Sequence, residues 1–220
     1  MILNRNWNIK LMNIERIRRW NRFFSLSSLR FMYLVATDPK YDRLYKRLKQ
    51  VSTIEGVFKT PQPWVTFQAL DFIETYVQPN MKVFEWGSGG STLWFQEKGC
   101  KVNAYEHHEE WYELVKSKLS NDNKVHYKTL TKGYTIPPAE ISSCDIIVID
   151  GRERVACAEQ IIELAKDGKI KEGALVLFDD SNRQRYSEVL KELSYYAKHT
   201  MACSDTSSVE ISKLTTLFLF

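Results

Sequence analysis

The stretch VFEWGSGGSTLWF, residues 83–95, constrains the fold more than any other part of the chain. An apolar run ends in Glu85, small residues follow from Gly87 to Ser91, and the apolar spacing of a helix begins at Ser91 or Thr92. Glycines allow a sharp turn and a close approach of the backbone to a ligand. A helix that starts there directs its unpaired N–H groups at the same ligand. The pattern predicts a parallel strand, a ligand-binding loop and a helix.

Strand and helix patterns alternate from Met81 to the end of the chain. The continuously apolar runs CDIIVID and GALVLFDD are typical of strands that are covered on both faces. The order of elements predicts an α/β fold with a doubly wound, mostly parallel sheet. We expect strands at 82–86, 101–105, 125–127, 145–149 and 174–178, helices at 92–98, 109–119, 155–166 and 184–196, and further strands near 201–204 and 214–220.

The N-terminal quarter differs from the rest in composition. Lys and Arg strongly outnumber Asp and Glu in residues 1–50, although the whole chain carries only +4. Residues 41–51 have the spacing of an amphipathic helix, the breaker TPQP follows at 60–63, and a second helix is expected at 64–77. The basic segment predicts contact with a peripheral membrane surface or another anionic partner, with nucleic acid the less expected of these. A solvated extension is the alternative.

Cysteine use and hydropathy bear on where the chain resides. The four cysteines, Cys100, Cys144, Cys157 and Cys203, are spread out and form no C-x-x-C pair, which predicts buried thiols in a reducing compartment. No stretch reaches the ~18 to 20 apolar residues that span a bilayer. The nearest candidate, residues 23–36, contains Arg30 and three serines, and we expect it to pack on the main domain, with a signal anchor or interfacial helix as alternatives. We therefore expect a cytoplasmic protein, with membrane association left open.

Polar residues follow the predicted strands where each one ends, which is where open parallel sheets bind ligands. Glu106 ends the second strand, at a position where a carboxylate can accept the hydroxyl hydrogens of a ribose. Asp150 ends the fourth strand, and Asp179 and Asp180 end the fifth. With the glycine loop, these residues define the candidate site.

The loop departs from the dinucleotide-binding pattern G-x-G-x-x-G. Thr92 stands where the third glycine would permit close packing of helix and strand. Glu85, two positions before the first glycine, would add negative charge beside a pyrophosphate. An acidic residue there suits a ligand with a cationic amino acid end, such as S-adenosylmethionine, which carries an ammonium and a sulfonium and no phosphates. The residues thus favour this cofactor over a nicotinamide dinucleotide.

The chain resembles the class I S-adenosylmethionine-dependent methyltransferases. The loop with Glu85, Gly87 and Gly89 is similar to their first motif and Glu106 to their ribose-binding acid, and the runs PWVTFQALDFIETYV, YEHHEEWYELV and LVLFDDSNRQRY resemble a small subgroup with an E-x-G-x-G-G-S-T loop. The resemblance covers residues 61–220. It implies a Rossmann-like methyltransferase domain there, preceded by a basic helical extension at 1–60. The cofactor-binding residues that it implies are Glu85, Gly87, Ser88, Gly89, Ser91, Thr92, Glu106, His107 and Asp150.

The predicted activity is O-methylation of a small-molecule or glycan hydroxyl. Positioning supplies much of the acceleration of methyl transfer, and a hydroxyl acceptor also needs a base. The candidates are Asp150, Asp179 and Asp180, while His107 and His108 are expected to border the pocket. A divalent cation on the three aspartates is a further hypothesis, because oxygen ligands suit magnesium, calcium or manganese. Against it, the similar cation-dependent enzymes usually have Asp-Asn where this chain has two aspartates, and strand-end aspartates can also cap helices.

Four arginines follow the same strand ends, and they predict either pairing with the aspartates or a clamp for an anionic substrate. They are Arg152, Arg154, Arg183 and Arg185. Two other functions fit the architecture. One is a nicotinamide- or nucleotide-binding oxidoreductase, which Glu85 and Thr92 disfavour. The other is a non-catalytic binding protein that has kept the fold.

Overall fold

The computed structural model describes residues 33, 37, 42–51, 53–120, 122–205 and 213–220. The chain divides into two compact units, Met1–Gln50 and Val51–Phe220. Helix α3 (Asp42–Val51) belongs to the first unit except for its last residue, and it confirms the amphipathic helix expected at 41–51. Most of the basic segment, and the apolar stretch at 23–36 apart from Tyr33, lie outside the described residues. The predicted domain boundary at residue 60 stays a prediction.

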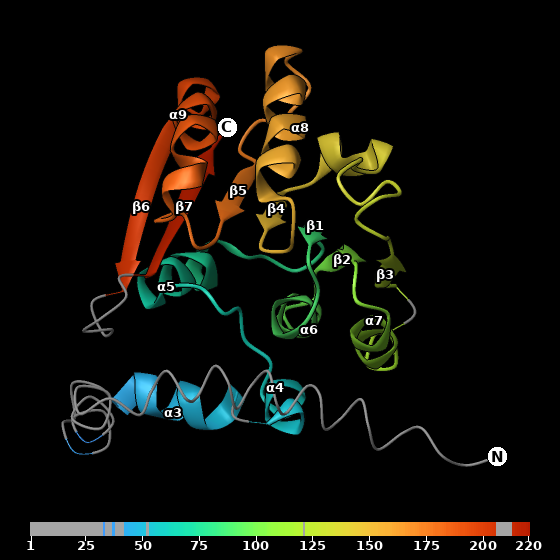
Figure 1. Ribbon diagram of the computed structural model, residues 1–220, viewed down its shortest axis with the longest axis vertical. Helices are drawn as coiled ribbons and strands as arrows, with labels where there is room; N and C mark the ends of the chain where they lie inside the picture. The colour runs from blue at the N-terminus through green and yellow to red at the C-terminus, as the bar shows by residue number, and fades with distance from the viewer. Residues whose placement is uncertain (1–32, 34–36, 38–41, 52, 121, 206–212) are drawn as a thin grey trace. The chain divides into compact units, whose positions relative to one another are not determined.

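A seven-stranded sheet with the order β3-β2-β1-β4-β5-β7-β6 forms the centre of the second unit (Figure 1). The first five strands pair in parallel, whereas β7 is antiparallel to both β5 and β6. The mostly parallel, doubly wound sheet is therefore confirmed. The strands are β1 Lys82–Trp86, β2 Lys101–Glu106, β3 Lys124–Tyr127, β4 Ile146–Ile149, β5 Leu175–Phe178, β6 His199–Asp205 and β7 Lys213–Leu219.

The helices lie close to the positions expected from the sequence. The predicted helix at 184–196 divides into a 3-10 turn and α9, and the one expected from residue 64 begins at Phe67, because the Thr66 side chain caps it by accepting from the N–H of Ala69. The helices are α4 Ile54–Lys59, α5 Phe67–Tyr76, α6 Gly90–Glu97, α7 Glu109–Lys116, α8 Arg154–Lys166 and α9 Ser187–Tyr196, with 3-10 helices η2 Ala139–Ser143 and η3 Gln184–Tyr186.

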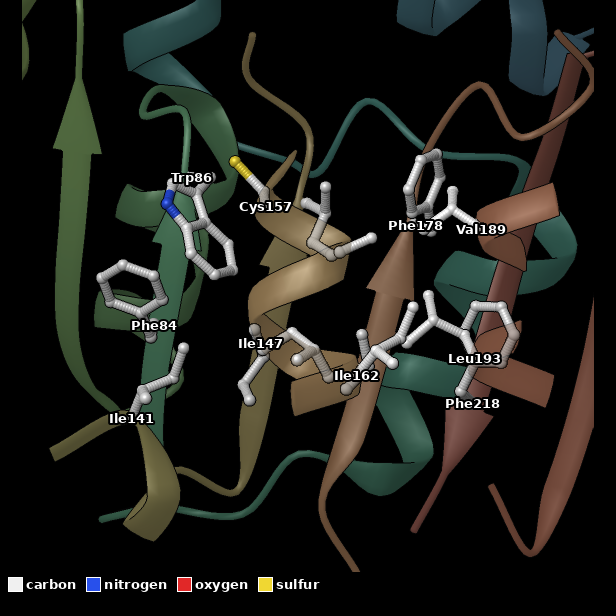
Figure 2. Packing of buried hydrophobic residues seen from close by; sticks show 14 of the residues in the cluster. Phe84, Trp86, Ile141, Ile147, Cys157, Ile162, Phe178, Val189, Leu193 and Phe218 are labelled. Atoms are coloured by element: carbon white, nitrogen blue, oxygen red, sulfur yellow. The ribbon is translucent and has the colours of Figure 1, made fainter. Parts of the chain in front are cut away.

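Helices cover both faces of the sheet. On one face, Cys157 and Ile162 of α8 and Leu193 of α9 belong to one apolar cluster with side chains of the strands, among them Phe84 and Phe178 (Figure 2). On the opposite face, α5 and α6 pack Leu70, Ile73, Trp94 and Phe95 against β1, β4 and β5. Each such side chain, when fully buried, contributes about 1.5–3 kcal/mol. This burial holds the carboxyl ends of the strands in fixed positions.

The cysteines and the described helices bear on two further expectations. All four thiols are free and buried, as predicted, and burial raises the pKa of the Cys100 thiol to about 11. A thiol in that state is a poor nucleophile and metal ligand. Within the described part of the chain, no helix is both long enough and apolar enough to cross a membrane.

The strand order creates a switch point between β1 and β4. From these two neighbouring strands the chain proceeds outward in opposite directions, to β2 and β3 on one side and to β5 and β7 on the other. In open α/β sheets the crevice for a ligand lies outside the carboxyl ends of the strands at such a point. The glycine loop follows β1 and Asp150 follows β4, so the candidate residues meet there.

Candidate functional site

The glycine loop turns sharply and packs against the end of β4. Gly87 has a positive φ of +98°, which a residue with a Cβ rarely adopts. A Cβ on Gly87 would lie 3.0 Å from the backbone nitrogen and Cα of Gly151. The N–H of Gly87 donates to the carbonyl of Tyr105 in β2 at 2.9 Å, so the turn is also fastened on its other side.

Helix α6 begins directly after the loop, as the sequence predicts. The side-chain oxygen of Thr92 accepts a hydrogen bond from the N–H of Gly89 at 2.9 Å. Thr92 is buried and Ser91 is partly exposed. Thr92, which replaces the third glycine of the dinucleotide pattern, therefore closes the turn that precedes the helix.

Glu85 is a fully buried carboxyl group beneath this helix start. Its side chain is 0% exposed, and neither carboxyl oxygen has a hydrogen bond of acceptable geometry to another described residue. Its neighbours across the sheet are Ala104 of β2 and Val148 of β4, which carry no charge. Burial raises the pKa of Glu85 to about 7, although the nearby hydroxyls of Thr92 and Ser91 favour the charged form. An acid without a partner at this position is suited to a cationic ligand.

Glu106, by contrast, has several partners. One oxygen accepts from the backbone N–H groups of His107 and His108 at 2.8 and 2.9 Å, and the other accepts from the N–H and hydroxyl of Ser88 at 3.2 and 3.1 Å. Burial disfavours the charge, but the hydrogen bonds and the His107 ring nitrogen, 3.0 Å away, outweigh it and lower the pKa of Glu106. The ionised Glu106 side chain thus joins the end of β2 to the glycine loop.

Two aromatic residues, whose part in the site the sequence did not reveal, support the loop. The Nε1–H of Trp111 in α7 donates to the carbonyl of Ser88 at 2.7 Å, and its ring stacks on Phe58 of α4 at 5.3 Å. The loop residues Gly87, Ser88 and Gly89 are therefore held from both sides.

Tyr134 anchors the segment that follows β3. Its ring is 0% exposed, its hydroxyl accepts from the N–H of Arg152 at 3.2 Å, and its carbonyl accepts from Nε1 of Trp86 at 2.9 Å. A Cβ on Gly151 would lie 1.8 Å from the Tyr134 hydroxyl, so only glycine fits there. The His107 ring lies edge-on to Tyr134 at 5.9 Å. The sequence signal was a single tyrosine in a loop without a motif, which does not reveal such a long-range contact.

Arg154 joins the strand-end aspartates. Its side chain, 9% exposed, donates to Asp150 Oδ1 at 2.8 Å and lies 3.5 Å from Asp180 Oδ2. It also donates to the backbone carbonyls of Asp150, Gly151 and Asp179. The sequence allowed the arginines either to pair with the aspartates or to bind an anionic substrate, and Arg154 pairs with the aspartates. Arg183 does the same, because it forms an ion pair with Asp180.

The three aspartates differ in how much of their bonding capacity remains. Asp179 is 2% exposed and has both oxygens engaged, by Thr215 Oγ1 at 2.8 Å and by Lys213 Nζ at 3.0 Å. The Asp150 side chain remains 33% exposed. Burial and the negative charge of Asp179 raise the pKa of Asp150, and the positive charges of Arg154 and Lys213 oppose this shift.

The proposed divalent cation is not supported. Among the residues that the structure describes, no three His, Cys, Asp or Glu side chains could hold a metal ion together. The physical reason lies in the ion pairs: Arg154, Arg183 and Lys213 already neutralise Asp150, Asp179 and Asp180. The three aspartates at these strand ends are thus paired with the cationic side chains of the protein itself.

Comparison with known proteins gives a likeness of fold. No protein-family model matches the chain, and no curated protein matches it. Among solved structures, the cofactor-bound protein Rv0187 from MTB has a TM-score of 0.56 at 14% identity, over 83% of this chain and 97% of that one. A SAM-dependent O-methyltransferase from Thermotoga maritima has a TM-score of 0.51 at 14% identity, over 75% of this chain and 70% of that one. The tRNA methyltransferase TrmI from Aquifex aeolicus also has a TM-score of 0.51 at 14% identity, over 76% of each chain. The chain therefore shares the Rossmann-like α/β fold of these structures, two of which are methyltransferases.

Proposed function

We propose that this chain is an S-adenosylmethionine-dependent methyltransferase. The observation that carries the proposal is Glu85 of β1, a buried acid whose two oxygens have no hydrogen-bond partner of acceptable geometry among the described residues. Burying a carboxyl group without a partner costs free energy, so such a group indicates a ligand that supplies the missing partner. The cationic amino acid end of S-adenosylmethionine is such a ligand.

The other end of the site fits the rest of this cofactor. Glu106 is ionised and fixed at the end of β2, where a ribose hydroxyl would take over the contact that the Ser88 hydroxyl now makes at 3.1 Å. Gly87 and Gly89 present backbone without side chains beside it. His107 and Ser91 border the same loop. When bound, this cofactor would supply an electrophilic methyl group on a sulfonium.

For the acceptor, we propose the hydroxyl group of a small molecule or glycan. Asp150 is the best placed base of the three aspartates, because Arg154 orients Oδ1 and the side chain as a whole remains 33% exposed and can receive a proton from a hydroxyl. Asp179 has no oxygen to spare and serves to position Lys213 and Thr215. The structural neighbours named above include an O-methyltransferase and a tRNA methyltransferase, so the fold leaves the acceptor open.

Calorimetry with S-adenosylhomocysteine and with NAD tests the cofactor. We expect binding of the first and none of the second, whereas preferential binding of NAD would support an oxidoreductase. Transfer of radioactive methyl from S-adenosylmethionine to a panel of phenols and methyl glycosides then tests the acceptor. Binding of the cofactor without transfer to any member would favour a non-catalytic protein. The Asp150→Asn variant should still bind S-adenosylhomocysteine in calorimetry. In the radioactive assay it should no longer transfer the methyl group.

We also propose that residues 1–50 bring the protein to an anionic surface. This proposal rests on the excess of Lys and Arg in that segment, of which α3 is described. Sedimentation with vesicles of phosphatidylcholine, with and without phosphatidylserine, tests it. Binding that requires phosphatidylserine and weakens at high salt supports the proposal, and equal sedimentation with both vesicles contradicts it.

A further inference from the structure

Glu85 is buried in surroundings that offer little compensation for a negative charge. It lies on the same face of β1 as Val83, which packs in the apolar cluster formed with α5 and α6. Ala104 and Val148 flank it in the sheet, and the groups of α6 near it are the hydroxyls of Ser91 and Thr92. None of these neighbours carries a charge. A carboxylate in this position has only the helix start and two hydroxyls to stabilise it.

The contrast with Glu106 shows what compensation requires. Both carboxyl groups are buried at the ends of neighbouring strands, at 0% and 4% exposure. Glu106 receives hydrogen bonds from Ser88, His107 and His108 and is stabilised as an anion. Glu85 receives none of acceptable geometry from any residue that the structure describes. In the ligand-free site, the surroundings of Glu106 therefore stabilise a negative charge, and those of Glu85 do not.

We propose that Glu85 determines ligand specificity at this site by a proton-linked mechanism: it is held as a neutral acid in the free protein and loses its proton when a ligand brings a cationic amino group to the glycine loop. This inference rests on the proposed function and goes beyond it, because it states how the cofactor is distinguished from other adenosine compounds. A nucleoside without an amino acid end has no cation to stabilise the anion, so it gains nothing from Glu85. An ammonium near the loop stabilises the anion strongly, because a charge pair in a buried site is weakly screened.

The proton has a definite path in this scheme. The Glu85 carboxyl O–H bond breaks, its electron pair stays on the carboxylate, and the proton passes to solvent and is taken up by the buffer. The ammonium of the ligand keeps its own protons. Binding is thus accompanied by net proton release. The free energy of binding becomes more favourable as the pH rises through the range in which free Glu85 titrates.

Calorimetry of S-adenosylhomocysteine in buffers with different ionisation enthalpies measures this release directly. Since the pKa of free Glu85 is about 7, we expect release of about 0.9 proton per ligand at pH 6 and about 0.1 at pH 8. The dissociation constant should be about tenfold lower at pH 8 than at pH 6. 5′-Methylthioadenosine, which keeps the nucleoside and lacks the amino acid end, should bind with no proton release through Glu85.

Variants separate Glu85 from other titrating groups. Glu85→Gln should abolish both the proton release and the tenfold pH dependence for S-adenosylhomocysteine, and leave binding of 5′-methylthioadenosine unchanged. Histidines also exchange protons in this pH range, so His199→Asn, at an exposed position on β6 outside the site, serves as the control and should keep the release. Far-ultraviolet circular dichroism checks that both variants are folded.

Each outcome has a defined meaning. If neither nucleoside binds, the proposed function fails. If S-adenosylhomocysteine binds with no buffer-dependent heat, or if Glu85→Gln releases as many protons as the native protein, the proposed function stands and this inference is wrong. Equal affinity of the native protein for both nucleosides at pH 8 would also contradict it.

Discussion

Replacing Glu85 with Gln should make the ligand-free protein more stable at high pH. Gln has nearly the same shape and cannot ionise, so the change removes the charge and preserves the packing of the 0% exposed side chain. The native carboxyl must lose a proton in an apolar site as the pH rises, and the amide need not. The variant is expected to differ from the native protein mainly in its pH dependence.

The magnitude follows from the displaced pKa. The folded-state pKa of about 7 lies above the value of 4.5 for an exposed Glu. The group therefore stabilises the folded state most at pH values below 4.5, and this contribution is lost as the pH rises through 7. Between pH 5 and pH 8 the loss amounts to about 2 to 3 kcal/mol for a shift of this size. The Glu85→Gln variant should not lose this stability between pH 5 and pH 8.

Urea unfolding followed by circular dichroism at pH 5 and pH 8 measures the difference. We expect the free energy of unfolding of Glu85→Gln, relative to the native protein, to rise by about 2 to 3 kcal/mol between the two pH values. Glu159→Gln, at an exposed position on α8, is the matched control and should show no such change. If Glu85→Gln and the native protein follow the same pH dependence, Glu85 is charged in the ligand-free protein, and the reasoning fails.

Three further predictions concern the other contacts of the site. Glu106→Ala should weaken binding of S-adenosylhomocysteine by about 1–3 kcal/mol in calorimetry, because buried hydrogen-bond donors lose their acceptor; unchanged affinity would contradict the ribose assignment. Arg154→Ala should lower the free energy of unfolding by about 3–5 kcal/mol, since it leaves Asp150 without its buried partner, and a change below 1 kcal/mol would show that the ion pairs are not structural. Gly151→Ala should destabilise the protein by about 2 kcal/mol or more, and adding Tyr134→Phe should recover part of that loss in a double-mutant cycle, because the clash is with the tyrosine hydroxyl. Additive effects of the last two changes would refute this contact.

Local patterns were enough to predict the elements of the sheet. The strand predicted at 82–86 is observed at Lys82–Trp86, and the helix predicted at 155–166 is Arg154–Lys166. Apolar runs and amphipathic spacing record which residues must be buried, and that requirement is carried by neighbouring positions in the chain. The antiparallel pairing of β7 and the order of the strands have no such local signal.

The site was predicted as a set of residues and not as a set of contacts. The prediction placed Glu85 and Glu106 correctly at the ends of β1 and β2, because strand ends are visible in the sequence. Their states differ because Ser88, His107 and His108 donate to Glu106, whereas Glu85 receives no hydrogen bond of acceptable geometry from the described residues. Such a difference depends on how loops from separate parts of the chain fold over each carboxyl group.

The aspartates illustrate the same division. Their positions after β4 and β5 follow from the strand pattern, and that pattern alone was compatible with a metal site. Arg154 lies near the start of α8, and Lys213 begins β7, more than thirty residues beyond Asp179 in the chain. Folding brings their cations to the aspartates and neutralises them. The sequence alone was thus enough to predict the glycine loop and the acidic residues around it. The charge state and ion pairing of these acids, and their capacity to bind a ligand, were decided by the tertiary structure, because electrostatic free energy depends on distance and burial in space.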